Sequence, residues 1–345
     1  MTTPFNVRSP RSRRAMAGVS LVELMIALAL GMIVMAAMVT VFASSSANRQ
    51  EIERASRQIE NGRYAMQLLS DDLRLAGFYG EFSVKSLGVP TLVSDPCSTS
   101  PADWSLGMPV SLVGYDNGVG APTCTNLNQV PGTDILVVRR AASCEAGVGS
   151  CPAVVAGQPY VQVAKCGTET PKTPYVIGLS GTANFNLHLR NCATDAGVRQ
   201  YFVRSYYLSS DNGHGVAIPT LKRMEFNGTG FVDVPLVEGI EQINFEYGID
   251  NDGDGAPDVF SADPTALGAT AKDQAAIWSN VVAVRISLLA RSIEPSNGYT
   301  DSKTYNLGLD KTGAPVTVTP GDNYRRHAYT SLVRVVNVAE RKDTP

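Results

Sequence analysis

Four aspartates near residue 250 have the spacing of a site for a hard cation. The run 250–255, Asp-Asn-Asp-Gly-Asp-Gly, fits the first half of a D-x-D-x-D-G calcium loop. Such a loop curls around the ion, so alternating carboxylates converge, and its sixth-position glycine allows the sharp turn. The bidentate glutamate expected at position 12 is missing, since Ser261 stands there, and the same run is also ordinary turn chemistry between strands. Our hypothesis, with a plain turn as the equal alternative, is a Ca²⁺ site built from Asp250, Asp252, Asp254 and Asp258.

Six cysteines provide the second group of reactive side chains, and all of them lie between residues 97 and 192. They are Cys97, Cys124, Cys144, Cys151, Cys166 and Cys192. No pair has the C-x₂-C spacing of a zinc site. An even number in an exported segment favours three disulfides. Pairing by proximity along the chain, 97–124, 144–151 and 166–192, is one of many possible connectivities.

Catalytic motifs are not found in the sequence. The three histidines, His188, His214 and His327, are scattered, and His188 sits in an alternating pattern typical of a structural strand residue. There is no G-x-S-x-G, phosphate loop or H-E-x-x-H motif. We therefore expect a protein that is not an enzyme and that requires no cofactor, with Ca²⁺ as the one ion that could bind.

Glu23 is a carboxylate at the start of a long apolar segment. The 20 residues from Leu24 to Ala43 carry no charge, and as a helix they would span about 30 Å, the thickness of a bilayer core. Arginines at positions 8, 11, 13 and 14 precede the segment. This charge bias predicts a single-pass inner-membrane protein with a cytoplasmic N-terminus and a periplasmic C-terminal region.

The alternatives for this segment are a cleaved signal peptide and a plain anchor. Small residues lie before the apolar stretch, at 15–18, and not after it, which argues against removal of the stretch. A plain anchor has no use for Glu23, because a carboxylate placed centrally in a bilayer costs on the order of 3 kcal/mol.

The run 18–28, Gly-Val-Ser-Leu-Val-Glu-Leu-Met-Ile-Ala-Leu, resembles the class III signal of type IV pilins and type II secretion pseudopilins. The resemblance implies that a prepilin peptidase cuts between Gly18 and Val19 and methylates the new N-terminus. Glu23 then becomes the fifth mature residue, which docks the subunit through a neighbour's N-terminal amine. Phenylalanine is commonest where this chain has Val19. A new ammonium group would give the Glu23 carboxylate a partner in lipid.

The helical pattern continues beyond the membrane segment. Proline is absent from 20–75, and one seam recurs at spacings of three and four residues. The seam consists of Ile52, Ala55, Ile59, Gly62, Met66, Leu69 and Leu73. We expect the first half of the helix to pack on neighbouring subunits and the second half on the chain's own globular region.

Beyond Gly77 the sequence is rich in short β-like runs separated by turn residues. The predicted strands are 135–139, 160–164, 185–189, 201–208, 221–226, 240–247, 281–289 and 332–338. The expected fold class is α+β, with a long N-terminal helix packed on a mostly antiparallel β-sheet and a disulfide-rich insertion. The predicted segments are a leader (1–18), a transmembrane assembly helix (19–43), its amphipathic continuation (44–76) and an exported β-rich domain (77–345) with a cysteine-containing insertion or subdomain (91–200).

Several further stretches resemble PilW-type minor pilins of the type IV pilus. They are 60–65, 72–80, 237–241, 247–250 and 278–285. The resemblance implies a subunit that helps to prime pilus assembly and sits near the filament tip. Its partners would be other minor pilins and the major pilin, the prepilin peptidase, the assembly platform and a PilY-type tip adhesin. The alternatives are a type II secretion pseudopilin and, in another class, a tip-exposed adhesin or ligand-binding module.

Net charge gives no argument for nucleic-acid binding, since the chain carries −3 overall. Two basic pairs, Arg139-Arg140 and Arg325-Arg326, are expected on solvated surface or in local ion pairs. Nucleic acid is therefore not an expected partner.

Overall fold

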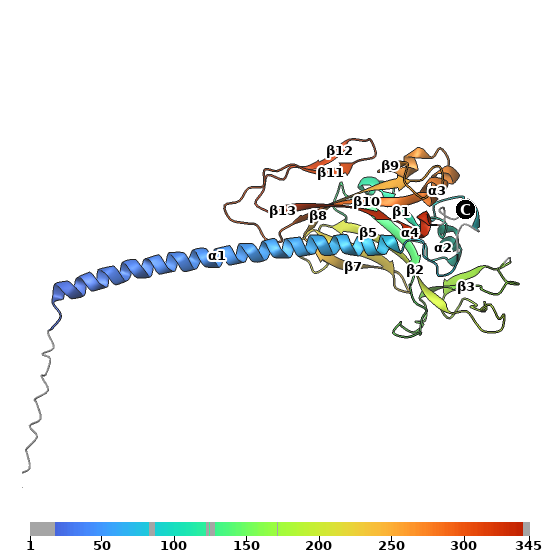
Figure 1. Cartoon of the computed structure of the whole chain (residues 1–345), viewed down its shortest axis with the longest axis horizontal. Helices are drawn as coiled ribbons and strands as arrows, with labels where there is room; N and C mark the ends of the chain where they lie inside the picture. The colour runs from blue at the N-terminus through green and yellow to red at the C-terminus, as the bar shows by residue number, and fades with distance from the viewer. Residues whose placement is uncertain (1–17, 83–86, 122–123, 125–127, 171, 341–345) are drawn as a thin grey trace, which may run out of the picture. The chain divides into compact units, whose positions relative to one another are not determined.

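The computed structural model describes residues 18–82, 87–121, 124, 128–170 and 172–340. The leader predicted at 1–18 therefore lies, except for Gly18, outside the described residues. The chain forms two compact units, one up to Glu53 and one from Arg54 onward, which we call the body. Helix α1 (Leu21–Arg74) runs through both units as one continuous helix (Figure 1).

In the first unit, every described residue from 18 to 50 is exposed. These exposed side chains include Leu24, Ile33 and Phe42. Helix α1 is the one helix in the described chain that is long and apolar enough to cross a membrane. A long apolar surface of this kind needs lipid or protein to cover it.

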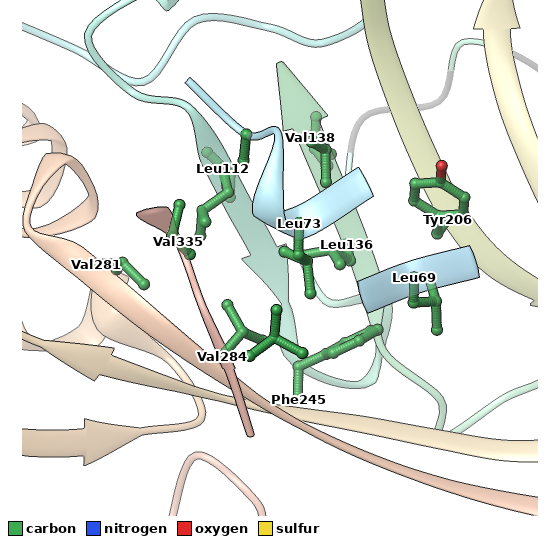
Figure 2. Packing of buried hydrophobic residues seen from close by; sticks show 14 of the residues in the cluster. Leu69, Leu73, Leu112, Leu136, Val138, Tyr206, Phe245, Val281, Val284 and Val335 are labelled. Carbon is green, nitrogen blue, oxygen red and sulfur yellow. The ribbon is translucent and has the colours of Figure 1, made fainter. Parts of the chain in front are cut away.

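In the body, the second half of α1 packs into the core. Leu69 and Leu73 are fully buried beside Leu136 and Val284 from two different sheets (Figure 2). The helix ends at Arg74, and Gly77 takes a positive φ of 72° that favours glycine.

The predicted seam of α1 is only partly correct. Gly62, Leu69 and Leu73 are buried as expected, but Ile52 is 68% and Ile59 41% exposed. The buried face instead includes polar residues, because it must also meet backbone carbonyls and charges of the body. These polar residues are Gln58, Ser70 and Asp72.

The larger sheet has seven strands in the order β1-β2-β5-β3-β4, with β6 paired to β5 and β7 paired to β6, all antiparallel. Its strands are β1 (Leu112–Tyr115), β2 (Ile135–Ala141), β3 (Pro159–Val163), β4 (Tyr175–Leu179), β5 (Val198–Ser209), β6 (Thr220–Phe226) and β7 (Phe231–Glu238). Strand β2 is almost entirely buried, which explains its apolar run at 135–138.

A second sheet has four antiparallel strands in the order β13-β10-β8-β9, and a separate hairpin pairs β11 with β12. The bounds are β8 (Ile240–Ile249), β9 (Val259–Ser261), β10 (Val281–Arg291), β11 (Tyr305–Leu309), β12 (Pro315–Val318) and β13 (Arg326–Arg334). The short helices are α2 (Pro101–Gly107), η2 (Asp116–Gly118), η3 (Pro264–Leu267), α3 (Ala271–Ser279) and α4 (Val336–Ala339). The long helix and antiparallel sheets confirm the predicted α+β class.

Two predicted strands are wrong. Residues 185–189 contribute only an isolated bridge between His188 and Asp195, because β4 occupies the edge of β3. The strand predicted at 332–338 ends at Arg334, where pairing with β10 stops at Ala283, and the chain then turns into α4.

The interpretation of 91–200 as an insertion or subdomain also needs correction. Strands β1 and β2 lie inside this range, yet they form the part of the large sheet on which α1 packs. All six cysteines lie in loops outside the strands, so each disulfide joins one loop position to another, and β1 and β2 belong to the central sheet and not to a separate domain.

Candidate functional site

The N-terminal residues of α1 have the features that the class III signal requires. Gly18 and Val19 precede the helix, and Glu23 lies in its first turn. A carboxylate in the first turn is favoured by the partial positive charge of the exposed backbone N–H groups. Val19 is 71% exposed. The arrangement presents the predicted new N-terminus and the carboxylate at one end of the apolar helix.

Three of the four predicted calcium ligands lie together in the loop between β8 and β9. One carboxylate oxygen from each of Asp250, Asp252 and Asp254 lies within 4.8 Å of the others. Asp250 is fully buried, and its two oxygens accept the backbone N–H groups of Gly253 at 2.6 Å and Gly255 at 3.0 Å. Asp252 and Asp254 are exposed.

Asp258 is not brought into this group. Its Oδ2 accepts the backbone N–H groups of Asn251 at 2.7 Å and Asp252 at 3.4 Å, so it closes the loop as a turn residue. Asp252 and Asp254 likewise each accept a backbone N–H group two residues on, which is ordinary Asx-turn geometry. The three clustered carboxylates fit a hard cation, and Ca²⁺ binding stays a proposal.

Calcium at 5 mM should raise the melting temperature of the full chain in detergent. Extracellular calcium modules bind with Kd on the order of 10⁻⁴–10⁻³ M. A Kd near 0.5 mM would stabilise the fold by about 1.4 kcal/mol, which corresponds to a shift of roughly 3–5 °C. The double variant Asp252→Asn, Asp254→Asn should remove the shift and leave the loop folded, because both side chains are exposed and an asparagine oxygen can still accept the Asx-turn hydrogen bonds. Magnesium is the control ion, and absence of both binding heat and thermal shift would disprove the site.

All six cysteines form disulfides. The pairs are Cys97–Cys124, Cys144–Cys151 and Cys166–Cys192, the same connectivity that proximity along the chain suggests. The third bridge closes a loop in which His188 Nδ1 contacts Glu169 Oε1 at 2.5 Å. This contact gives His188 a structural role, as expected.

A buried charge cluster that sequence patterns did not reveal fixes α1 to the large sheet. Asp72 on α1 is 5% exposed, and its Oδ1 accepts hydrogen bonds from Arg140 at 2.5 Å and Arg204 at 3.0 Å. Tyr206 donates to Oδ2 at 2.7 Å. Burial opposes ionisation of Asp72, but the two guanidinium groups and the tyrosine outweigh it and hold the pKa of Asp72 below its usual value. We call these four residues the Asp72 cluster.

The expectation of solvated surface or local ion pairs is wrong for Arg139, whereas Arg326 meets it through ion pairs although its side chain is buried. Arg139 is 1% exposed and donates to the backbone carbonyls of Val110 and Ser94. Arg326 is also buried and bonds to carboxylates of Glu241 and Asp322. Both side chains form hydrogen bonds with groups in loops that fold over the sheets. No local sequence pattern predicts these contacts.

Comparisons with known proteins agree with the N-terminal motif and with the body. Residues 205–337 match the family described as Type IV Pilus-assembly protein W, and residues 13–39 match the prokaryotic N-terminal methylation motif. No curated protein matches the chain. A type IV-like pilin from Thermus thermophilus is similar at 14% identity, with coverage of 82% of this chain and 98% of that one, but the TM-score of 0.37 is too low to carry an argument.

An apolar N-terminal helix introduced by a methylation motif defines a prepilin-type protein. Within that class, the body is similar to the PilW-type minor pilins, since residues 205–337, from within β5 to the first residues of α4, match that family.

Proposed function

We propose that this chain is a non-enzymatic subunit that helps to prime type IV pilus assembly and sits at or near the filament tip. The observation that carries the proposal is Glu23, the one charged residue between positions 15 and 48. A lone carboxylate on an otherwise apolar helix is stabilised by a cation in the membrane, and a neighbouring subunit's N-terminal amine supplies one.

The size of the body supports a place at the tip. It holds two main sheets and three disulfide-attached loops, and the face of α1 between residues 18 and 50 is left for partners. Those partners would be other minor pilins, the major pilin and a tip adhesin, with the prepilin peptidase and assembly platform acting earlier in the inner membrane. The body would then be periplasmic first and displayed at the cell surface later.

Deletion of the gene should remove surface pili and twitching motility, and the wild-type gene should restore both. Complementation with Glu23→Ala should fail although the protein accumulates in the membrane. If pili persist and secretion of exoproteins is lost instead, the chain is a type II secretion pseudopilin. An epitope tag on the body should label one end of each filament, and labelling along the shaft would contradict the tip position.

The runner-up function is a tip-exposed adhesin. It is favoured by Val148, in the loop closed by Cys144–Cys151, and by Val154 and Val155 just after that loop, since each of these side chains is about half exposed or more. Exposed apolar side chains on a cross-linked loop are typical of contact surfaces.

A further inference from the structure

Asp134 joins the two main sheets of the body. It lies directly before β2 of the seven-stranded sheet, and its backbone N–H donates to the carbonyl of Ile243 in β8 at 3.2 Å. Its Oδ2 accepts the backbone N–H of Phe245 at 2.8 Å, and its Oδ1 accepts that of Asn117 at 2.9 Å. Asp134 thus connects β8 to the seven-stranded sheet through hydrogen bonds. Its side chain is buried, with 2% of its surface exposed.

A second buried carboxylate, Asp116, shares a neighbour with Asp134. Asn117 donates from its backbone to Asp134 and from Nδ2 to Asp116 Oδ2 at 3.1 Å. Asp116 is 5% exposed, and among the described residues its Oδ1 has no hydrogen-bond partner. The hydroxyl of Tyr247 is also buried without such a partner in the described chain. The hydroxyl fits at this position because Gly114 of β1 lacks a side chain. A Cβ at Gly114 would overlap the Tyr247 hydroxyl.

The charges that face this pair are mostly acidic. Tyr247 on β8 experiences the charges of Asp134, Asp116 and Asp263, the last of which precedes η3, as well as Tyr115 of β1. Asp116 additionally faces Asp310 and Lys311 in the turn between β11 and β12. The charged groups around this site are therefore four carboxylates, which are Asp116, Asp134, Asp263 and Asp310, and one lysine, Lys311.

We propose that the Asp116–Asp134 pair retains one proton near neutral pH and that the junction between the two sheets weakens when this proton is lost. Two carboxylates in one buried site cannot both ionise without mutual repulsion. The free Oδ1 of Asp116 is available for the proton, because both oxygens of Asp134 already accept backbone N–H groups.

The titration behaviour agrees with this geometry. Burial raises the pKa of Asp134 to about 7, although two backbone N–H groups oppose the rise, and burial also raises the pKa of Asp116. A carboxyl group whose folded-state pKa lies above its unfolded value of about 4 stabilises the fold below pH 4. That stability is lost as the pH rises through about 7.

The test compares thermal unfolding of the full chain in detergent at pH 5 and pH 8, for wild type and Asp116→Asn. The amide mimics the protonated carboxyl and removes the repulsion. We expect equal melting temperatures at pH 5 and a variant that melts about 2–4 °C above wild type at pH 8. Asp71→Asn, which removes an exposed carboxylate that pairs with Arg74 and not with a histidine, is the control and should follow wild type at both pH values.

A variant that is less stable than wild type at pH 8 would overturn the proposal, because a merely structural carboxylate loses contacts when it is neutralised. Titration of the histidines affects the stability of wild type and of Asp116→Asn equally, since both proteins have the same three histidines. It therefore does not contribute to the difference between their melting temperatures. If the Asp116→Asn variant does not fold, amide hydrogen exchange of the wild-type protein tests the proposal instead. Protection of the Phe245 amide, corrected for the intrinsic rate, should fall about tenfold or more between pH 5 and pH 8, and unchanged protection would refute the junction.

Discussion

Replacing Gly18 by valine should abolish processing of the precursor while leaving its fold intact. A Cβ at Gly18 would meet no atom within 4 Å, so the substitution introduces no clash in the structure. The predicted peptidase cut after Gly18 should nevertheless fail, since a branched side chain now stands at the scissile bond. N-terminal sequencing and intact mass of the membrane form would then show a chain that retains the leader, with essentially no product starting at Val19.

Gly31→Ala is the matched control for this experiment. A Cβ at Gly31 also meets no atom within 4 Å, and the residue lies on the apolar helix that follows Gly18. This variant should be processed like wild type. A wild-type mature protein that begins at any residue other than Val19 would contradict the assignment of the cleavage site, and normal processing of Gly18→Val would contradict the need for glycine.

Replacing Asp72 by asparagine should destabilise the body by about 3–5 kcal/mol, because the largely buried Arg140 loses its carboxylate partner and Arg204 keeps only the longer contact with Glu225 at 3.4 Å. Urea unfolding of the full chain in detergent would measure the loss. The pKa of Asp72 is lowered in the folded state, so its contribution is present above the unfolded value of about 4 and disappears as the pH falls through the folded value. The difference in free energy of unfolding between the variant and wild type should therefore become smaller at acidic pH.

Asp71→Asn provides the control on the same helix. Asp71 is exposed and, within the described residues, forms an ion pair with Arg74 at 3.4 Å, so its loss should change stability by less than about 0.5 kcal/mol. Equal effects of the two substitutions would show that the Asp72 cluster does not anchor α1 to the sheet.

Elements with a strong local signal were predictable from the sequence. The apolar run with Glu23, the absence of proline and Gly77 define α1 to within a residue or two of its ends. Strands β2, β6 and β8 were also located, because continuous or alternating apolar residues lie between clear turn residues. The aspartate run placed a turn after β8, although only its folding shows that Asp258 bonds to the loop backbone and does not join the other three carboxylates.

The sequence alone determined the N-terminal motif, the membrane-compatible helix and the general α+β class, since these depend on residues adjacent along the chain. Tertiary structure decided which face of α1 is buried, why Asp72, Arg139 and Arg326 leave the surface, and how Asp116 meets Asp134. These features pair groups that are distant in sequence, such as Asp72 with Arg204, and their energies depend on burial and on the charges nearby. No local pattern encodes such an environment, which exists only after the two sheets and the helix have packed together.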